Sequence, residues 1–246
     1  NALKVDPGNT TALAFLSSAL NEIGDRKQAA YFLDFDSLIK TTLMDTKEWH
    51  KSTAEFNKAL VEAVYEHPTL SEQKSNRSLS NGQCTSNLFD GNETLSLIQL
   101  KDQILATYEN YKIEHPIQPN HPFLFQHPDQ ISIYCWANVM DDGGFHDTHF
   151  HPTAWLSGVY YPQLPKEVAK PNQKSKEGFL EFGRSYYRLM SSDSPPVFLV
   201  QPREGLMVLS PSYFGHRTIP FKSKQTRISI AFDIIPKSFV NRNEPN

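Results

Sequence analysis

The stretch HDTHFHP, residues 146–152, places three histidines and one aspartate within six consecutive positions. Imidazole and carboxylate groups are the side chains that most often bind a catalytic metal ion. His149 and His151 stand two residues apart, and residues with this spacing point to the same face of a β-strand. The sequence therefore predicts that these two histidines bind one metal ion at the end of a strand.

Other candidate ligands lie before and after this pair. Asp147 is in phase with both histidines if the extended structure reaches that far, whereas His146 is out of phase with His149 and is given no role. A further histidine, His216, occurs in the later stretch SPSYFGHRTIPF, after a proline and a glycine. We expect it at a turn that leads into a strand, where it can supply a third imidazole.

An arginine follows His216 eleven residues later, in the stretch RISIAFDII. Strand alternation puts Arg227, Ser229 and Ala231 on one face, and the isoleucines on the other. If the arginine face lines a barrel interior, the buried guanidinium needs an anionic partner, because an unpaired buried charge is strongly destabilising. A ligand carboxylate that accepts two N–H groups is the natural partner, so we expect an anionic ligand near the metal.

Short β-prone runs separated by glycine, proline and polar residues begin at about residue 123. They cover residues 131–139, 155–161, 178–183, 197–201, 205–210 and 227–235. This pattern predicts a sandwich or a barrel. Helical patterns precede the strands instead of alternating with them, which argues against a Rossmann sheet. The glycine-rich nucleotide motifs and G-x-S-x-G are absent from the sequence, so nucleotide binding and a serine hydrolase lack support.

The first 30 residues have a helical pattern. Asn9 is a candidate N-cap, Gly24 a candidate stop, and Asp25 a second N-cap. The segment resembles the end of one tetratricopeptide repeat and the start of another, and an ordinary helical hairpin is the alternative. The residues that carry this resemblance are Ala2, Pro7, Ala12, Gly24 and Ala29.

The following region mixes predicted elements. Residues 32–40 are predicted to be extended, and Asp45 with Glu48 predicts the start of an amphipathic helix that contains Trp49 and ends near residue 66. Residues 67–95 are rich in serine, asparagine, glycine and threonine, which predicts a long loop. A second amphipathic helix from about Leu97 to Tyr108 should lie on a sheet.

Composition limits the classes of protein that the chain can represent. The 246 residues suffice for one large domain, or for one domain with a small appendage. The net charge of −3 and the lack of a basic stripe argue against a nucleic-acid partner. No apolar run approaches the roughly 20 residues that cross a bilayer, so no membrane partner is expected. Cys84 and Cys135 are isolated, which favours a reducing cytoplasm.

The order of these motifs resembles that of the iron(II)/2-oxoglutarate-dependent oxygenases. The order is H-x-H, a strand with two tyrosines, GFLEFG, a later histidine and R-x-S. The chain looks most like a bacterial branch that often follows tetratricopeptide repeats. The resemblance covers about residues 31–238 and is densest over 131–236. Cupin patterns match in part, and cupins share the same barrel.

The resemblance implies a mainly β fold with N-terminal helices, namely a double-stranded β-helix (a jelly-roll or cupin-like barrel) flanked by amphipathic helices. The predicted parts are a helical segment 1–30, an oxygenase-like domain 31–240 with its barrel core at about 123–238, and a tail 241–246. It also implies that His149 and His216 bind the metal. The 2-oxoglutarate carboxylate would be bound by Arg227, Ser229 and Tyr161.

One position departs from the family pattern. The family has aspartate or glutamate where this chain has His151. His151 can be the third ligand, Asp147 can supply the carboxylate, or the site can keep two protein ligands. We favour His151, because it occupies the matching position and face. Three neutral imidazoles suit Fe(II) and equally suit Zn(II).

The predicted function is a dioxygenase that uses Fe(II), 2-oxoglutarate and dioxygen to hydroxylate an unknown substrate. One alternative is a zinc-dependent hydrolase or lyase with a three-histidine, cupin-like site. Another is a catalytically degenerate binding module, with the helical N-terminus recruiting a protein partner. The missing carboxylate favours this last alternative, and the ordered motifs favour the first.

Overall fold

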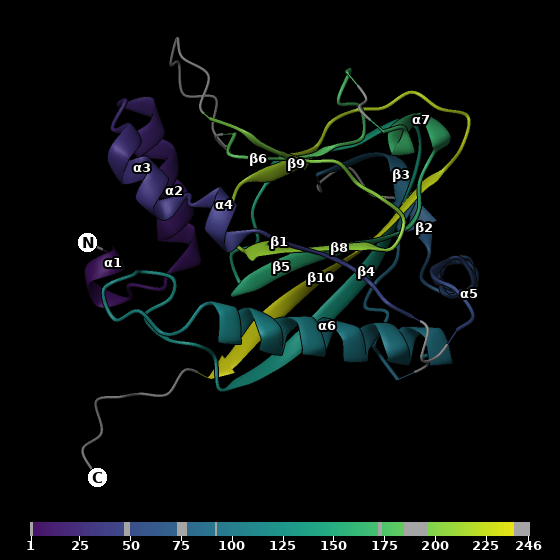
Figure 1. Ribbon diagram of the computed structural model, residues 1–246, viewed down its shortest axis with the longest axis horizontal. Coiled ribbons are helices and arrows are strands. Elements are labelled where there is room, and N and C mark those ends of the chain that lie inside the picture. The colour runs from purple at the N-terminus through teal and green to yellow at the C-terminus, as the bar shows by residue number, and fades with distance from the viewer. Residues whose placement is uncertain are drawn as a thin grey trace.

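The computed structural model describes residues 2–46, 50–72, 78–91, 93–171, 174–184 and 196–238. Its strands form one ten-stranded antiparallel sheet, which curls so that two layers face each other (Figure 1). The helices lie outside these layers. The predicted mainly β fold with N-terminal helices is therefore confirmed. The predicted tail 241–246 lies outside the described residues.

The larger layer contains, in spatial order, β1 (Lys40–Leu43), β8 (Leu206–Pro211), β5 (Leu156–Gln163), β10 (Arg227–Ser238) and β4 (Gln130–His149). The smaller layer contains β9 (His216–Thr218), β6 (Leu180–Phe182) and β7 (Phe198–Val200). The long strand β4 joins the layers, because its first part pairs with β10 and its end pairs with β9. Strand β1 thus lies well before the predicted barrel core of about 123–238, within which the first strand begins at Gln130.

Residues 67–95 are not a single loop, so that prediction is wrong. They contain β2 (Ser71–Glu72) and β3 (Leu79–Cys84), and β3 pairs with β4 on the side away from β10. Strands at a sheet edge tolerate polar residues, which is why composition did not reveal them. Gly82 allows the close pairing, since a Cβ there would lie 2.6 Å from the Val139 carbonyl oxygen.

The N-terminal helices are α1 (Ala2–Val5), α2 (Thr10–Glu22) and α3 (Arg26–Phe32). The predicted caps are confirmed, because Asn9 accepts from the Ala12 N–H and Asp25 accepts from the Gln28 N–H. Gly24 follows α2 with φ of 77°, a conformation that glycine adopts without strain. The relation to tetratricopeptide repeats stays a prediction.

Two predictions between residues 32 and 66 are wrong. The segment predicted to be extended contains the short helix α4 (Phe35–Leu38), because Asp34 caps it by accepting from the Ser37 N–H. Helix α5 (Thr53–Tyr65) begins later than Asp45, because Ser52 is the N-cap and accepts from the Glu55 N–H. Glu48 and Trp49 lie outside the described residues.

Helix α6 (Leu95–Glu114) lies across the larger layer, as predicted (Figure 1). Its Tyr108 and Tyr111 make edge contacts with Trp155, at centroid distances of 6.1 and 6.0 Å. His115 ends this helix and is buried against two carbonyl oxygens, Tyr111 O and Ser37 O, each 2.8 Å away. The last helix is α7 (Lys166–Ala169). Within the described ranges, no helix is long and apolar enough to cross a membrane.

Candidate metal centre and its pocket

Strand β10 separates the hydrophobic core from a pocket that contains several polar side chains. Its residues Ile228, Ile230, Phe232 and Ile234 are fully buried in the core. The alternating residues Arg227, Ser229 and Ala231 line a pocket of about 60 Å³ between the two layers. The alternation predicted from the sequence is therefore confirmed. A lining of this kind gives the barrel a polar interior at one end.

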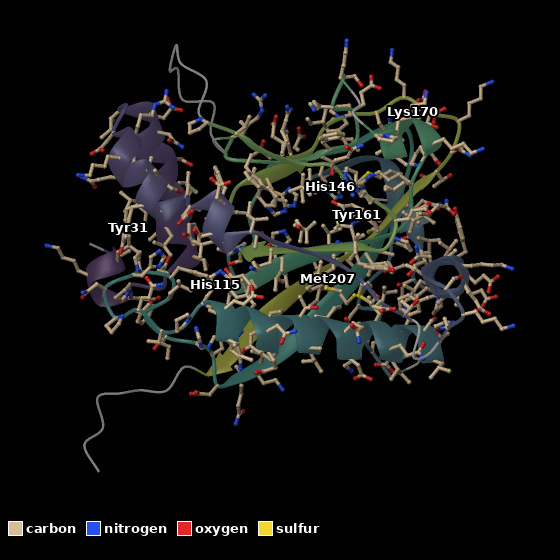
Figure 2. The ribbon with its side chains drawn as sticks, in the orientation of Figure 1. Tyr31, His115, His146, Tyr161, Lys170 and Met207 are labelled. Carbon is tan, nitrogen blue, oxygen red and sulfur yellow. The ribbon has the colours of Figure 1, made fainter. Side chains whose placement is uncertain are left out.

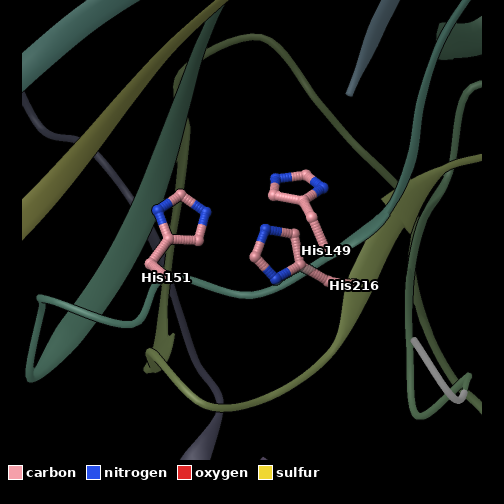
Figure 3. A group of neighbouring side chains, drawn as sticks. All are labelled: His149, His151 and His216. Carbon is pink, nitrogen blue, oxygen red and sulfur yellow. The ribbon is translucent and has the colours of Figure 1, made fainter. Parts of the chain in front are cut away.

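Three histidines converge at the mouth of this pocket (Figure 3). One ring nitrogen from each of His149, His151 and His216 lies within 4.8 Å of the others. His149 ends β4 and is the cross-strand partner of His216, which begins β9 and so already belongs to a strand. His151 lies two residues beyond β4, and its N–H donates to the Ser212 carbonyl oxygen, 2.9 Å away. The structure thus brings the three predicted ligands together.

Backbone carbonyls orient two of the three rings. His149 Nδ1 lies 2.7 Å from the Asp147 carbonyl oxygen, and His216 Nδ1 lies 2.9 Å from the Phe214 carbonyl oxygen. A carbonyl accepts only, so each Nδ1 carries the proton and each Nε2 keeps a free lone pair. Neutral imidazoles with a free Nε2 are in the form that binds a metal ion.

A carboxylate takes the corresponding place beside the third ring. His151 Nδ1 lies 2.7 Å from Asp233 Oδ1, and Asp233 is 9% exposed. The Nε2 atom of His151 is buried and has no hydrogen-bond partner among the described residues. A buried acceptor without a partner is costly unless a ligand satisfies it. The three-histidine group therefore fits a metal ion.

Asp233 was missed in the sequence, although a signal for it existed. It follows Arg227, Ser229 and Ala231 at the same spacing along β10, and it lines the neighbouring cleft beside the histidines. The prediction from the sequence covers Arg227, Ser229 and Ala231 only. One more step would have placed a carboxylate on the same face as the predicted ligands.

Burial favours the neutral form of three histidines in this region. Burial, together with the neighbouring His151, lowers the pKa of His149 to about 4. Burial and the neighbouring His149 also hold the pKa of His216 and of His146 well below the usual range. Metal binding needs deprotonated ligands, and His149 and His216 therefore do not have to lose a proton at neutral pH.

The other two candidates of the HDTHFHP stretch lie in different places. Asp147 is exposed and does not belong to the three-histidine group. His146 lines the pocket, with its Nδ1 2.9 Å from the Ser78 hydroxyl oxygen (Figure 2). The β4–β9 register shifts between His146 and His149. A bulge of this kind breaks strict alternation, which explains why phase alone gave His146 no role.

The inner end of the pocket holds an arginine without an ionic partner. Arg227 is 1% exposed, and no carboxylate in the described ranges forms an ion pair with it. Its Nη1 lies 3.2 Å from the Ser229 hydroxyl oxygen and 3.5 Å from Met140 Sδ, while its Nε has no described partner. Burial lowers the pKa of Arg227. A buried, unpaired guanidinium is costly, so an anionic ligand is expected here.

Tyr161 lies beside this arginine. The Arg227 Cζ atom is 5.2 Å from the centroid of its ring. The hydroxyl of Tyr161 is buried without a hydrogen-bond partner among the described residues. Burial raises the pKa of Tyr161, and Arg227 opposes that shift. The hydroxyl is therefore a neutral donor for a ligand in the pocket.

A second, open cleft lies on the other side of the histidines. It has a volume of about 590 Å³ and shares His149 and His151 with the inner pocket. Tyr134 and Trp136 line it, with ring centroids 5.6 Å apart, and Trp136 stacks on His151 at 5.8 Å. The candidate metal ligands thus border both a small pocket and a larger cleft.

A curled antiparallel sheet of two facing layers is a jelly-roll architecture. Solved structures are similar in fold. A prolyl-4-hydroxylase from Pseudomonas putida has 14% identity and a TM-score of 0.53, over 85% of this chain and 98% of that chain. A prolyl hydroxylase from Trichoplax adhaerens, in complex with a hypoxia inducible factor peptide fragment, has 10% identity and a TM-score of 0.57, over 90% and 91%. A viral collagen prolyl hydroxylase from Paramecium Bursaria Chlorella virus-1, in a 2-oxoglutarate complex, has 11% identity and a TM-score of 0.52, over 82% and 97%.

The sequence match identifies the family of the barrel. Residues 134–233 match the model of the family described as "Putative 2OG-Fe(II) oxygenase", and this range contains the three histidines and Arg227. The predicted family resemblance is confirmed, and it indicates an oxidoreductase that uses iron and 2-oxoglutarate. No curated protein matches the chain in sequence.

Proposed function

We propose that this protein is an Fe(II)- and 2-oxoglutarate-dependent dioxygenase that hydroxylates its substrate, with iron held by His149, His151 and His216. One observation carries the proposal. The enclosed pocket has the three-histidine group at its mouth and the unpaired Arg227 among its lining residues. A dicarboxylate that binds the metal at one end and a guanidinium at the other satisfies both.

The inner pocket is suited to the distal carboxylate of 2-oxoglutarate. Arg227 offers N–H groups in a fixed plane, which matches the geometry of a carboxylate. Ser229 lies within hydrogen-bond distance of Arg227 and holds Nη1 in place, and the free hydroxyl of Tyr161 is available as a further donor. These three residues would fix the position of the co-substrate before any reaction begins.

The bound iron and 2-oxoglutarate supply the oxidising chemistry: dioxygen is reduced, 2-oxoglutarate becomes succinate and carbon dioxide, and a substrate C–H becomes C–OH. The protein supplies orientation and a dry environment. Leu180, Phe182 and Val208 line the inner pocket and are buried. An apolar lining strengthens the attraction between Arg227 and a carboxylate, since it keeps water away from both.

The open cleft is the proposed binding place of the substrate. It is lined by His149 and His151 and not by Arg227, so a substrate there can approach the metal without displacing a co-substrate that Arg227 binds. Tyr134 and Trp136 offer flat apolar surfaces at its edge. The prolyl hydroxylase from Trichoplax adhaerens was solved with a peptide fragment, and an extended peptide is a suitable first candidate for this cleft.

The test is 2-oxoglutarate binding to the Fe(II) protein under anaerobic conditions, followed by succinate formation in air. We expect the wild-type protein to bind and to produce succinate, and Arg227→Met to lose binding. Arg203→Met, which removes an exposed arginine, is the matched control and should behave as the wild type. His151→Ala shows whether this imidazole is required. The proposal fails if wild type and Arg227→Met bind 2-oxoglutarate equally.

A zinc-dependent hydrolase remains the competing function, because three imidazoles are also a common zinc site. The buried Arg227 favours the oxygenase, since water activation by zinc gives no use for an enclosed guanidinium. Metal analysis of anaerobically purified protein separates the two. About one equivalent of retained zinc, with Fe(II) unable to support succinate formation, would favour the hydrolase.

A further inference from the structure

The three histidines differ in what lies behind them. Two have a backbone carbonyl at Nδ1, whereas His151 has the carboxylate of Asp233 at 2.7 Å. We propose that Asp233 is a positioning residue for His151, which orients the ring toward the metal and supplies the site with a negative charge. The inference rests on the proposed metal centre. In this proposal, Asp233 supplies the carboxylate that is missing from position 151, although it lies behind the imidazole of His151.

The position of Asp233 is fixed by the sheet. It lies in the middle of β10, paired with Tyr134 on β4 and with Ser157 on β5. The next residue, Ile234, accepts the Trp155 N–H at 2.9 Å. The segment that carries His151 is therefore attached to the same strand as Asp233. A carboxylate held this rigidly needs little further ordering to orient a neighbouring ring.

The ring of His151 is held on two sides. Trp136 stacks against its face, with centroids 5.8 Å apart and an interplanar angle of 27°. Asp233 Oδ1 lies 2.7 Å from its Nδ1, as an ion-pair contact. The contact does not have the angles of a regular hydrogen bond, since Oδ1 has no hydrogen-bond partner among the described residues. With Nδ1 turned to the carboxylate, the buried Nε2 is the atom left for the metal.

Among the described residues, Asp233 has no second ion-pair partner. Within the described ranges, its one ion-pair contact is with His151. Its neighbour Cys135 is fully buried, and burial, with the charge of Asp233, raises the pKa of that thiol. A carboxylate behind a metal-binding imidazole makes the ring a better donor and fixes its tautomer. Asp233 therefore acts on the metal through His151.

The chain offers a matched control for this carboxylate. Asp147 lies near the same histidines but is exposed at the open cleft, outside the three-histidine group. If the Asp147 carboxylate bound the metal, Asp147→Asn would weaken metal binding and Asp233→Asn would not. The two isosteric changes, Asp233→Asn and Asp147→Asn, thus distinguish the two carboxylates without altering volume.

The experiment measures Co(II) binding to the metal-free full chain by its visible absorption, with 2-oxoglutarate absent. We expect Asp233→Asn to weaken Co(II) binding about 10- to 100-fold, and Asp147→Asn to leave it unchanged. Nitrogen-15 spectra of histidine-labelled, metal-free protein give a second measurement. They should show one histidine changing its tautomer balance in Asp233→Asn and none in Asp147→Asn. Asp233→Ser replaces Asp233→Asn if the latter does not fold.

A double-mutant cycle tests whether Asp233 acts through His151. In a His151→Ala background, Asp233→Asn should cause no further loss of Co(II) affinity. Equal Co(II) affinity of wild type and Asp233→Asn, or an equal loss in both backgrounds, would overturn the inference. Failure of the wild type to bind Co(II) would instead overturn the proposed metal centre. The two failures are therefore distinguishable.

Discussion

The two faces of strand β10 lie in different environments, because its residues point alternately into the hydrophobic core and toward the pocket. On one face, Ile230 and Phe232 are fully buried in the hydrophobic core. On the other face, Arg227 and Asp233 are also buried, but they lie beside the pocket and the candidate metal ligands. Apolar burial stabilises the fold, whereas burial of charged groups without full pairing destabilises it. One strand thus contributes stability with one face and binding with the other.

Strand β5 repeats this division with two adjacent tyrosines. The Tyr160 hydroxyl donates to Asn57 Oδ1 at 2.5 Å, and its ring contacts Phe56 at a centroid distance of 6.1 Å. Tyr161 faces the pocket beside Arg227, with an unsatisfied hydroxyl. The hydroxyl on the core face is therefore hydrogen-bonded, whereas the hydroxyl on the pocket face has no hydrogen-bond partner among the described residues. An unsatisfied polar group is the mark of the face that awaits a ligand.

The largest expected effect comes from the core face. Phe232→Ala should lower the free energy of unfolding by about 3–5 kcal/mol, because it removes a fully buried ring and leaves a cavity. Guanidinium chloride unfolding of the metal-free protein measures this. The protein that remains folded should bind 2-oxoglutarate with nearly wild-type affinity. A large loss of 2-oxoglutarate affinity with unchanged stability would contradict the division between the two faces.

The pocket face should respond in the opposite way. Arg227→Met should reduce 2-oxoglutarate affinity about 10- to 150-fold, the equivalent of about 1.5–3 kcal/mol for hydrogen bonds to a charged group. Stability should stay the same or rise, since the change removes an unpaired buried charge. Calorimetric titration and denaturant unfolding of the same samples give both values. A fall in stability as large as that of Phe232→Ala would show that Arg227 is a structural residue.

Regular alternation explains how far the sequence could predict this site. Arg227, Ser229 and Tyr161 line the pocket, as their phase predicted: Arg227 and Ser229 alternate along β10, and Tyr161 is in phase with Ser157 and Val159 on β5. The order of the motifs along the chain identified His216 as a candidate ligand. Its pairing with His149 across β4 and β9 could not be predicted from sequence spacing. Long-range pairing depends on the curl of the whole sheet, which no local pattern encodes.

The failures have local physical causes. His146 lines the pocket although it is three residues from His149, because the register shift between them breaks the alternation of β4. The edge strand β3 was missed because its polar residues, such as Ser80 and Gln83, pair with β4 in the sheet and still resemble a loop in composition. The face of Asp233 follows from the same alternation along β10, but its contact with His151 joins residues far apart in the sequence and could not be predicted from spacing.

A smaller effect would test how the core face is packed. The ring of Phe232 lies over Gly158, so that a Cβ at this position would be 2.3 Å from the ring and 2.8 Å from the Val208 carbonyl oxygen. Gly158→Ala should therefore lower the free energy of unfolding by about 1–3 kcal/mol through overpacking. In a Phe232→Leu background the loss should be smaller, which denaturant unfolding can measure. Equal losses in both backgrounds would mean that the ring does not restrict this position.

The smallest effect distinguishes the two tyrosines. Tyr161→Phe should weaken 2-oxoglutarate binding by about 2- to 13-fold, the value of one hydrogen bond of roughly 0.5–1.5 kcal/mol. It should not lower stability, because the hydroxyl it removes has no partner among the described residues. The matched change Tyr160→Phe leaves Asn57 without its donor, so it should lower the free energy of unfolding by about 1–3 kcal/mol and spare 2-oxoglutarate binding. If both changes weakened 2-oxoglutarate binding equally, the two faces of β5 would not be energetically separate.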